Sequence, residues 1–333
     1  MLLLFNALAH FCVDGLCASA LFGKLQAPGT GWILLYDTLA FSTQCLVGLA
    51  ADRLKRQRGA ELVSAALLAA GWFLPGASVL HVWLLGLGNS LFHVAGGVMT
   101  MKRSGGKAAD LGLFVAPGAM GLTLGMLFSH CGGLFTVLLL ICAAGAYFLE
   151  DRTPEDPVRE HGGSGLTAPL LLTLAVAVRA VGGAAVSFPW KTGVFWALAL
   201  TVCVVAGKMA GGAICDRLGP GKTALWSVPA AALLIAFGCG FAAPSLMGQF
   251  LLNLSMPVTL WLMYRHMPED PGFAFGLAAS ALWPGTIAGQ WMTLTGPALW
   301  VCVLVSFGFG LWAVLNASKQ PDSVPASGKG DKK

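Results

Sequence analysis

Long apolar segments separated by short polar ones dominate the sequence. A helix needs about 20 predominantly apolar residues to cross the hydrocarbon core of a bilayer. Twelve segments fit this requirement and lack the alternation of barrel strands, so we predict an all-α membrane protein. The predicted transmembrane helices span residues 2–22, 31–51, 59–75, 79–101, 110–128, 133–149, 166–187, 194–215, 222–241, 245–264, 272–293 and 296–317.

Two of the polar connections repeat one another. The segments Gly48–Arg58 and Gly212–Lys222 both read G-x-x-x-D-R-L-x-x-x-[K/R], and they lie 164 residues apart in a chain of 333. A repeat at half the chain length predicts two pseudo-symmetric six-helix bundles, an arrangement typical of alternating-access transporters. The expected parts are an N-terminal bundle (1–149), a cytoplasmic linker (150–165), a C-terminal bundle (166–317) and a disordered cytoplasmic tail (318–333).

Composition supports a lipid environment. The chain is 56% hydrophobic and 11% charged, whereas a soluble domain carries roughly 25% charged residues. The nine cysteines lie mostly in apolar segments and form no CxxC pair, so we expect buried thiols, no disulfide framework, no metal site and no cofactor. The first segment has no basic region before it, so we interpret it as a retained helix rather than a signal peptide.

The basic residues are distributed unevenly between alternate connections. Only Lys24 and Lys191 lie in one set of connections, while Arg179 and Lys208 lie inside predicted helices. The positive-inside rule therefore places both termini in the cytoplasm, in a chain embedded in the plasma membrane. The net charge of +5 then reflects topology and contact with anionic lipid, with no nucleic-acid partner. The other sixteen of the 20 basic residues are Arg53, Lys55, Arg56, Arg58, Lys102, Arg103, Lys107, Arg152, Arg159, Arg217, Lys222, Arg265, Lys319, Lys329, Lys332 and Lys333.

With the repeated loops in place between helices 2 and 3 and between helices 8 and 9, the chain resembles the major facilitator superfamily. The family loop reads G-x-x-x-D-[R/K]-x-G-x-[R/K]-[R/K], and the first copy here has Lys55 in place of the glycine, which predicts a less tight turn. The resemblance implies that helices 1 and 7 face each other across a cavity. It also implies that charged contacts of Asp52, Arg53, Asp216 and Arg217 brace the inward gate.

Three shorter stretches are similar to the fosmidomycin-resistance-like branch of exporters. They are Ala9–Asp14 in helix 1, Phe92–Gly97 in helix 4, and Val178-Arg179 followed by Phe188-Pro189 in helix 7. The second has Val94 where the branch usually has proline. Pro117 and the Gly121–Gly125 pair also resemble a helix 5 motif of exporters, although close helix packing explains them equally well. The resemblance implies export of a drug-like or amphipathic compound.

Polar residues inside the membrane are costly, so they are the candidate functional residues. Asn6, His10 and Asp14 follow one another at intervals of four and share one face of helix 1. The repeat period carries Asp14 to position 178, next to Arg179. We therefore predict an Asp14–Arg179 pair near the midplane, direct or through substrate, that protonation of Asp14 would release. A permanent structural ion pair is the alternative.

Other candidates divide between the two halves. His10 is a candidate proton relay or a satisfied buried histidine. Asn89 and His93 share a face of helix 4, and the repeat maps Asn89 onto Asn253, so the two amides line the cavity or bond neighbouring helices. We also predict binding or coupling roles for Asp37, Lys208 and Trp283. The alternatives are that Asp37 is solvated at the outer end and that Lys208 extends to the headgroups. The sequence Trp283-Pro284-Gly285 also predicts a second helix bend.

These features predict a secondary active transporter for a small organic solute, coupled to protons and active as a monomer. The alternatives within transport are an importer or uniporter of an organic anion bound by Arg179 and Lys208, and, with less support, a metal-ion transporter that uses His10, Asp14 and His93. A membrane-embedded enzyme would need a motif such as His-Glu-x-x-His or Gly-x-Ser-x-Gly, and the sequence has neither. A sensor without transport activity would be expected to lose the buried charges.

Overall fold

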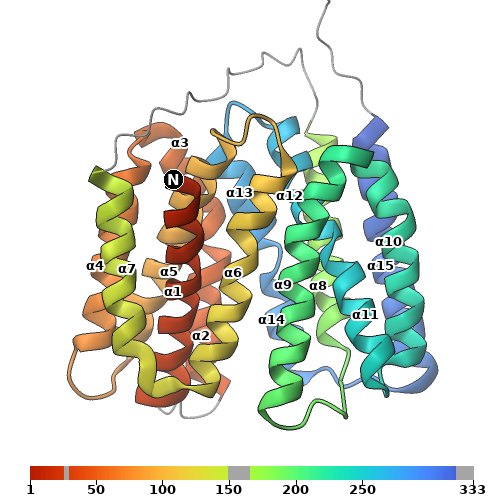
Figure 1. The fold of residues 1–333 in the computed structure, drawn as a ribbon, viewed down its shortest axis with the longest axis horizontal. Coiled ribbons are helices and arrows are strands. Elements are labelled where there is room, and N and C mark those ends of the chain that lie inside the picture. The colour runs from red at the N-terminus through yellow and green to blue at the C-terminus, as the bar shows by residue number, and fades with distance from the viewer. Residues whose placement is uncertain (26–29, 149–165, 320–333) are drawn as a thin grey trace, which may run out of the picture.

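The protein is described by a computed structural model that covers residues 1–25, 30–148 and 166–319. The helices form two groups that lie side by side, residues 2–148 on the left of Figure 1 and residues 167–319 on the right. Ten helices in the described ranges are long and apolar enough to cross a membrane. The predicted linker (150–165) and most of the predicted tail (320–333) lie outside the described residues.

Every predicted transmembrane segment of the N-terminal group is helical in the structure. Two of these segments contain π-helical stretches, one that ends the first segment and one that joins α2 to α3. The helices are α1 (Leu2–Ser19, followed by the π-helix Ala20–Lys24), α2 (Thr30–Asp37), the π-helix Thr38–Ser42, α3 (Gln44–Leu54), α4 (Gln57–Phe73), α5 (Val79–Met101), α6 (Ala108–Leu127) and α7 (Gly132–Phe148), with a short 3-10 helix (Ser129–Cys131) before α7.

The predicted segments of the C-terminal group are helical too, but two of them are interrupted. The tenth predicted segment forms α11 and α12, and the eleventh forms α13 and α14. The helices are α8 (Thr167–Ala184), α9 (Gly193–Leu218), α10 (Pro220–Gly238), α11 (Ala242–Asn253), α12 (Ser255–His266), α13 (Pro271–Ser280), α14 (Trp283–Trp291) and α15 (Gly296–Lys319).

Proline explains both interruptions. A proline ring clashes with the carbonyl four residues earlier and removes one helical hydrogen bond. Pro257 lies four residues after Asn253, where α11 ends, and Pro284 lies four residues after Ser280, where α13 ends. The bend predicted at Trp283-Pro284-Gly285 is therefore confirmed, and the segment predicted over 245–264 lies within one candidate membrane span (Ala242–His266) that is interrupted only at Leu254. Helix 7 is shorter than predicted, because Pro189 lies beyond its last residue, Ala184.

Glycines allow the first and fifth segments to approach closely. A Cβ atom on Gly121 would overlap the carbonyl oxygen of Phe11, and one on Gly125 would overlap that of Gly15. Small residues that let backbones touch are the main means of helix association in lipid, where burial of apolar side chains supplies little driving force. The Gly121–Gly125 pair therefore fixes α6 against α1, which carries His10 and Asp14.

Two helix pairs form the most extensive contacts between the two groups. Helix α3 packs on α13, and α6 packs on α9. Glycines line both contacts, since a Cβ on Gly48 would overlap the carbonyl oxygen of Gly272, and a Cβ on Gly212 would overlap that of Ala108. The connections α3–α4, α5–α6, α9–α10 and α12–α13 lie at the same end of the molecule as the N-terminus. We call it the basic end, because these connections carry most of the described lysines and arginines outside the helices.

Lys55 ends α3 in a left-handed conformation, with φ 52° and ψ 32°. It is the only residue other than glycine with positive φ in the described ranges. The equivalent residue of the second repeat, 164 positions later, is Gly219, which also has positive φ (84°) and ends α9. Because Gly219 has ψ 161° and Lys55 has ψ 32°, the two turns differ in conformation. The left-handed conformation of Lys55 costs a residue with a side chain roughly 1–2 kcal/mol.

Replacing Lys55 with glycine should stabilise the protein. We expect Lys55→Gly to raise the free energy of unfolding by roughly 0.5–1 kcal/mol, because relief of left-handed strain outweighs the greater entropy of glycine in the unfolded chain. Thermal unfolding of the detergent-purified protein measures the change. The matched variant Gly219→Lys should destabilise by about 1–3 kcal/mol. A lower midpoint for Lys55→Gly would show that the lysine side chain is itself stabilising.

Candidate functional site

A cavity of about 410 Å³ lies between the two groups of helices. His10 and Asp14 of α1 line it on one side, and Arg179 of α8 lines it on the other, so helices 1 and 7 form opposite walls as the family resemblance implied. Four more predicted residues line the same cavity: Asp37, Asn89, His93 and Lys208. Its lining is otherwise largely apolar, which strengthens electrostatic interactions inside it.

The N-terminal wall carries a cluster of His10, Asp14 and His93. His10 Nε2 lies 3.4 Å from Asp14 Oδ2, and His93 Nε2 lies 3.7 Å from Asp14 Oδ1. Asn89 Nδ2 donates a hydrogen bond to Asp14 Oδ1 over 3.2 Å. The two imidazole rings meet edge to face, with centroids 4.4 Å apart. Residues from α1 and α5 thus converge on one carboxylate.

The tautomers of the two histidines follow from their other contacts. His10 Nδ1 lies 2.8 Å from the carbonyl oxygen of Phe114, and His93 Nδ1 lies 2.9 Å from that of Asn89. A carbonyl oxygen only accepts, so both Nδ1 atoms carry the proton. In the neutral rings, both Nε2 lone pairs then point toward the Asp14 carboxylate. Three acceptors that converge in this way require a positive charge between them.

The C-terminal wall carries the two cations. Arg179 Nη1 donates to Ser255 Oγ over 2.8 Å, and Lys208 Nζ donates to the carbonyl oxygen of Val115 over 3.3 Å. Within the described residues, neither side chain forms an ion pair. The direct form of the predicted Asp14–Arg179 pair is therefore not present in this conformation. Lys208 points into the cavity rather than toward the headgroups, and its charge interacts with that of Asp14.

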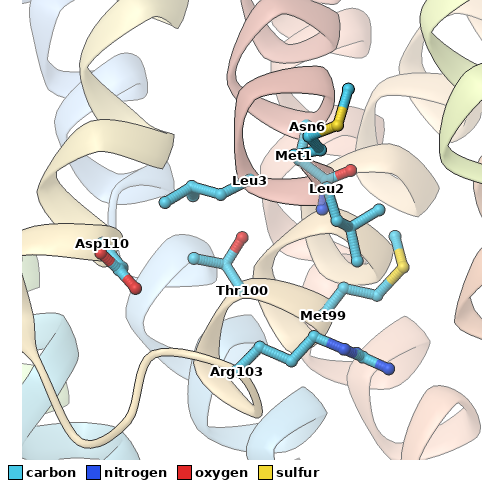
Figure 2. Close-up of a pocket in the computed structure, with 8 residues that line it drawn as sticks. All are labelled: Met1, Leu2, Leu3, Asn6, Met99, Thr100, Arg103 and Asp110. Carbon is cyan, nitrogen blue, oxygen red and sulfur yellow. The ribbon is translucent and has the colours of Figure 1, made fainter. Parts of the chain in front are cut away.

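Asn6 lies away from this cavity, although it shares a helix face with His10. It lines a separate pocket of about 150 Å³ together with Thr100, Arg103 and Asp110. Figure 2 shows Asn6 beside Met1 and Leu2, on the opposite side of this pocket from Asp110. The Asn6 side chain is fully buried, and neither its amide nitrogen nor its oxygen has a hydrogen-bond partner among the described residues.

Asn253 and Trp283 also lie outside the cavity lining. Asn253 is buried at the end of α11 and donates to the carbonyl oxygen of Gln249, so it does not repeat the cavity position of Asn89. The break at Pro257 directly after α11 explains why the repeat fails at this position. Trp283 Nε1 donates to Thr38 Oγ1 over 3.1 Å and ties α14 to the second predicted segment.

Two buried polar residues, Ser255 and Glu61, are missing from the sequence-based candidates. Ser255 positions the guanidinium of Arg179, and nothing in its local sequence distinguishes it from the other serines. Glu61 is buried in α4, and neither carboxyl oxygen has a hydrogen-bond partner among the described residues. An acidic residue within the predicted helix 59–75 was the signal that could have identified Glu61.

Asp52 and Asp216 form two equivalent contacts at the basic end. Asp52 accepts hydrogen bonds from the backbone N–H groups of Gly272 (2.7 Å) and Phe273 (2.8 Å), which begin α13. Asp216 accepts from the N–H groups of Ala108 (2.7 Å) and Ala109 (3.0 Å), which begin α6. The donors and the acceptors are each 164 residues apart, since 216 − 52 = 164 and 272 − 108 = 164.

Helix N-termini carry unpaired N–H groups and a partial positive charge, so they bind carboxylates favourably. Each of these aspartates joins one half of the molecule to the other and holds the basic end closed. These contacts differ from the expected ones, in which arginine side chains also take part. Arg53 and Arg217 are exposed, and neither forms an ion pair with another described residue. The aspartates act on helix ends rather than on basic partners.

No family model and no curated protein matches the amino-acid sequence. Solved structures match the fold. The fucose:proton symporter FucP of E. coli superposes with a TM-score of 0.69 over 96% of this chain and 98% of that chain, at 13% sequence identity. FucP in its outward conformation gives a TM-score of 0.70 over 95% and 99% of the two chains, at 12% identity. A bacterial homologue of the iron transporter ferroportin in an outward-facing state gives 0.62 over 96% and 98%, at 13% identity.

The chain has the major facilitator fold. The likeness extends over nearly the whole length of each protein, so it includes both groups of helices. All three structures are of transporters. The narrower resemblance to fosmidomycin-resistance exporters is not tested by these comparisons and stays a prediction.

Removing the charge of Asp52 should weaken closure of the basic end. We expect Asp52→Asn to fold normally but to open more often, because an amide oxygen replaces one of two charged acceptors at the start of α13. Cys45, whose backbone N–H bonds Ser280 Oγ across the α3–α13 contact, reports opening through its alkylation rate, read by peptide mass spectrometry. We expect at least a ~5-fold increase, which corresponds to about 1 kcal/mol.

Asp216→Asn should have a similar effect on the α6–α9 contact. Glu269→Gln removes an exposed charge at the same end of the molecule and serves as the control, with no expected change. Equal alkylation rates in Asp52→Asn, Glu269→Gln and the unmodified protein would show that the aspartate does not hold the halves together.

Proposed function

We propose that this protein is a secondary transporter that carries a small organic anion across the plasma membrane together with a cation, and the proton is the first candidate for that cation. It works as a monomer of twelve spans in two bundles, with both termini in the cytoplasm. The observation that carries this proposal is the division of charge in one cavity. Two cations that form no ion pair with another described residue face three converging acceptors.

The anion site is supported by Arg179 and Lys208. A buried charge is expensive unless it is paired, and these two side chains have spare hydrogen-bond donors that point into an apolar cavity. A carboxylate, phosphonate or sulfonate group would satisfy them both. Arg179 is already oriented by Ser255, so little conformational entropy is lost when an anion binds.

Co-transport with a cation is supported by charge balance. The negative charge of Asp14 partly offsets the positive charge of Lys208. An anion that binds the two cations leaves Asp14 and its two histidine neighbours in need of positive charge. Binding of the anion and of a proton therefore favour each other, which is the condition for symport.

The exporter resemblance and this symport scheme predict different directions. Under an inward proton gradient, symport imports the anion, whereas export requires exchange against protons. The fucose:proton symporter, which has the same fold, is a precedent for proton-coupled symport. Closure of the basic end by Asp52 and Asp216 supports an alternating-access cycle in which the opposite end opens first.

The experiment is a proteoliposome assay with a pH-sensitive dye trapped inside. A panel of small carboxylates, phosphonates and sulfonates is added outside with and without a pH gradient, and internal pH and solute uptake are recorded. We expect at least one anion to enter together with protons. Arg179→Gln and Lys208→Gln should weaken its apparent affinity by about 10–100-fold, because each loses a hydrogen bond from a charged group.

Asp14→Asn separates the two roles. It should still exchange the anion across the membrane, but without proton movement. Lys191→Gln removes an exposed charge in an outer connection and serves as the matched control. Anion entry without a change of internal pH would contradict proton coupling. Proton-driven export of the anion would contradict the proposed direction. Unchanged anion affinity in both Arg179→Gln and Lys208→Gln would contradict the anion site.

A further inference from the structure

The acceptor cluster of the N-terminal wall has the composition of a transition-metal site. We propose that His10, Asp14 and His93 bind a divalent transition-metal ion of the Zn²⁺ type. Their ligand atoms all lie within 4.8 Å of one another. Two imidazole nitrogens and one carboxylate oxygen are a common ligand set for such ions. The proposal rests on the proposed function, because the metal would occupy the cation position of the same cavity.

The distances fit an ion held by all three side chains. Zinc lies about 2.0–2.2 Å from histidine nitrogen and carboxylate oxygen, so ligand atoms of a tetrahedral site are roughly 3.4 Å apart. Here the two histidine–carboxylate separations are 3.4 Å and 3.7 Å, to different oxygens of Asp14, and with one ligand atom from each residue the three atoms lie within 4.8 Å of one another. The Nε2 atoms already point toward Asp14 with their lone pairs free. Side-chain shifts that bring the ligand atoms closer together would close the site around a metal.

The surrounding hydrogen bonds hold the ligands in the orientation that metal binding needs. Metal-binding histidines usually donate their other ring N–H to a carbonyl or carboxylate, which fixes the tautomer and raises the basicity of the ring. Both histidines do this here, toward the carbonyl oxygens of Phe114 and Asn89. The Asn89 amide also donates to Asp14. The cluster is therefore fixed by α1, α5 and α6 together.

The cluster leaves one side open. The side chains of His10, His93 and Asp14 are 6%, 14% and 20% exposed, and all three line the central cavity. Three protein ligands and an open position are typical of a metal that accepts a further ligand. Arg179 and Lys208 line the same cavity and would repel a bare dication, so an anion bound to them would balance its charge. The cavity thus suits an anion with a metal-coordinating group, carried together with its metal.

Metal binding is tested on the full chain purified in detergent, without any transport step. Zn²⁺ is titrated by calorimetry, and Co²⁺ serves as a spectroscopic substitute whose visible absorption reports its coordination. We expect one equivalent of Zn²⁺ and the intense Co²⁺ bands of a four-coordinate site. His10→Ala, His93→Ala and Asp14→Asn should each reduce the affinity at least ~10-fold, while His130→Ala, in an exposed connection, should not.

Thermal unfolding of each variant checks that it is folded, and Asp14→Asn preserves the shape of the side chain it replaces. No stoichiometric binding, or binding that all three ligand variants retain, would overturn the metal site. The outcome is independent of the transport proposal. Proton-coupled anion flux without metal binding would contradict only this inference, and metal binding without any flux would contradict only the proposed transport.

Discussion

The balance of charge inside an apolar cavity governs this structure. Two cations and the cluster of His10, Asp14 and His93 line this cavity. An isolated charge in such an apolar environment has a high free-energy cost. Each wall is only partly satisfied by its own neighbours: Arg179 by a serine hydroxyl, Lys208 by a carbonyl, and Asp14 by an amide and two histidines. Neutral groups therefore provide most of the contacts of these charges within the described residues.

The duplicated loops contact the opposite half of the molecule. Their aspartates bind the first N–H groups of α13 and α6, each on the opposite half of the molecule. Glycines beside both contacts allow the backbones to touch. The two halves therefore meet at the basic end through equivalent contacts of α3 with α13 and of α6 with α9.

Some positions of the repeat make the same contacts in both halves of the molecule, and others do not. Asp52 and Asp216 make equivalent hydrogen bonds to helix N-termini that lie 164 residues apart, whereas Lys55 is left-handed (φ 52°, ψ 32°) and Gly219 (φ 84°, ψ 161°) is not. Asn253 does not reproduce the cavity position of Asn89. The repeat therefore does not fix the surroundings of each side chain.

The sequence by itself determined the helical segments, the repeat and most of the polar residues that line the cavity. Apolar length and spacing along one helix are local properties, so His10 with Asp14 and Asn89 with His93 could be found without coordinates. The tertiary structure decided which of these residues meet. His93 lies beside Asp14 although the two residues are 79 positions apart in the chain. Asn6 lines another pocket although it shares a face of α1 with His10 and Asp14. Contacts between helices depend on rotation, breaks and close approach, and a single sequence does not encode these locally.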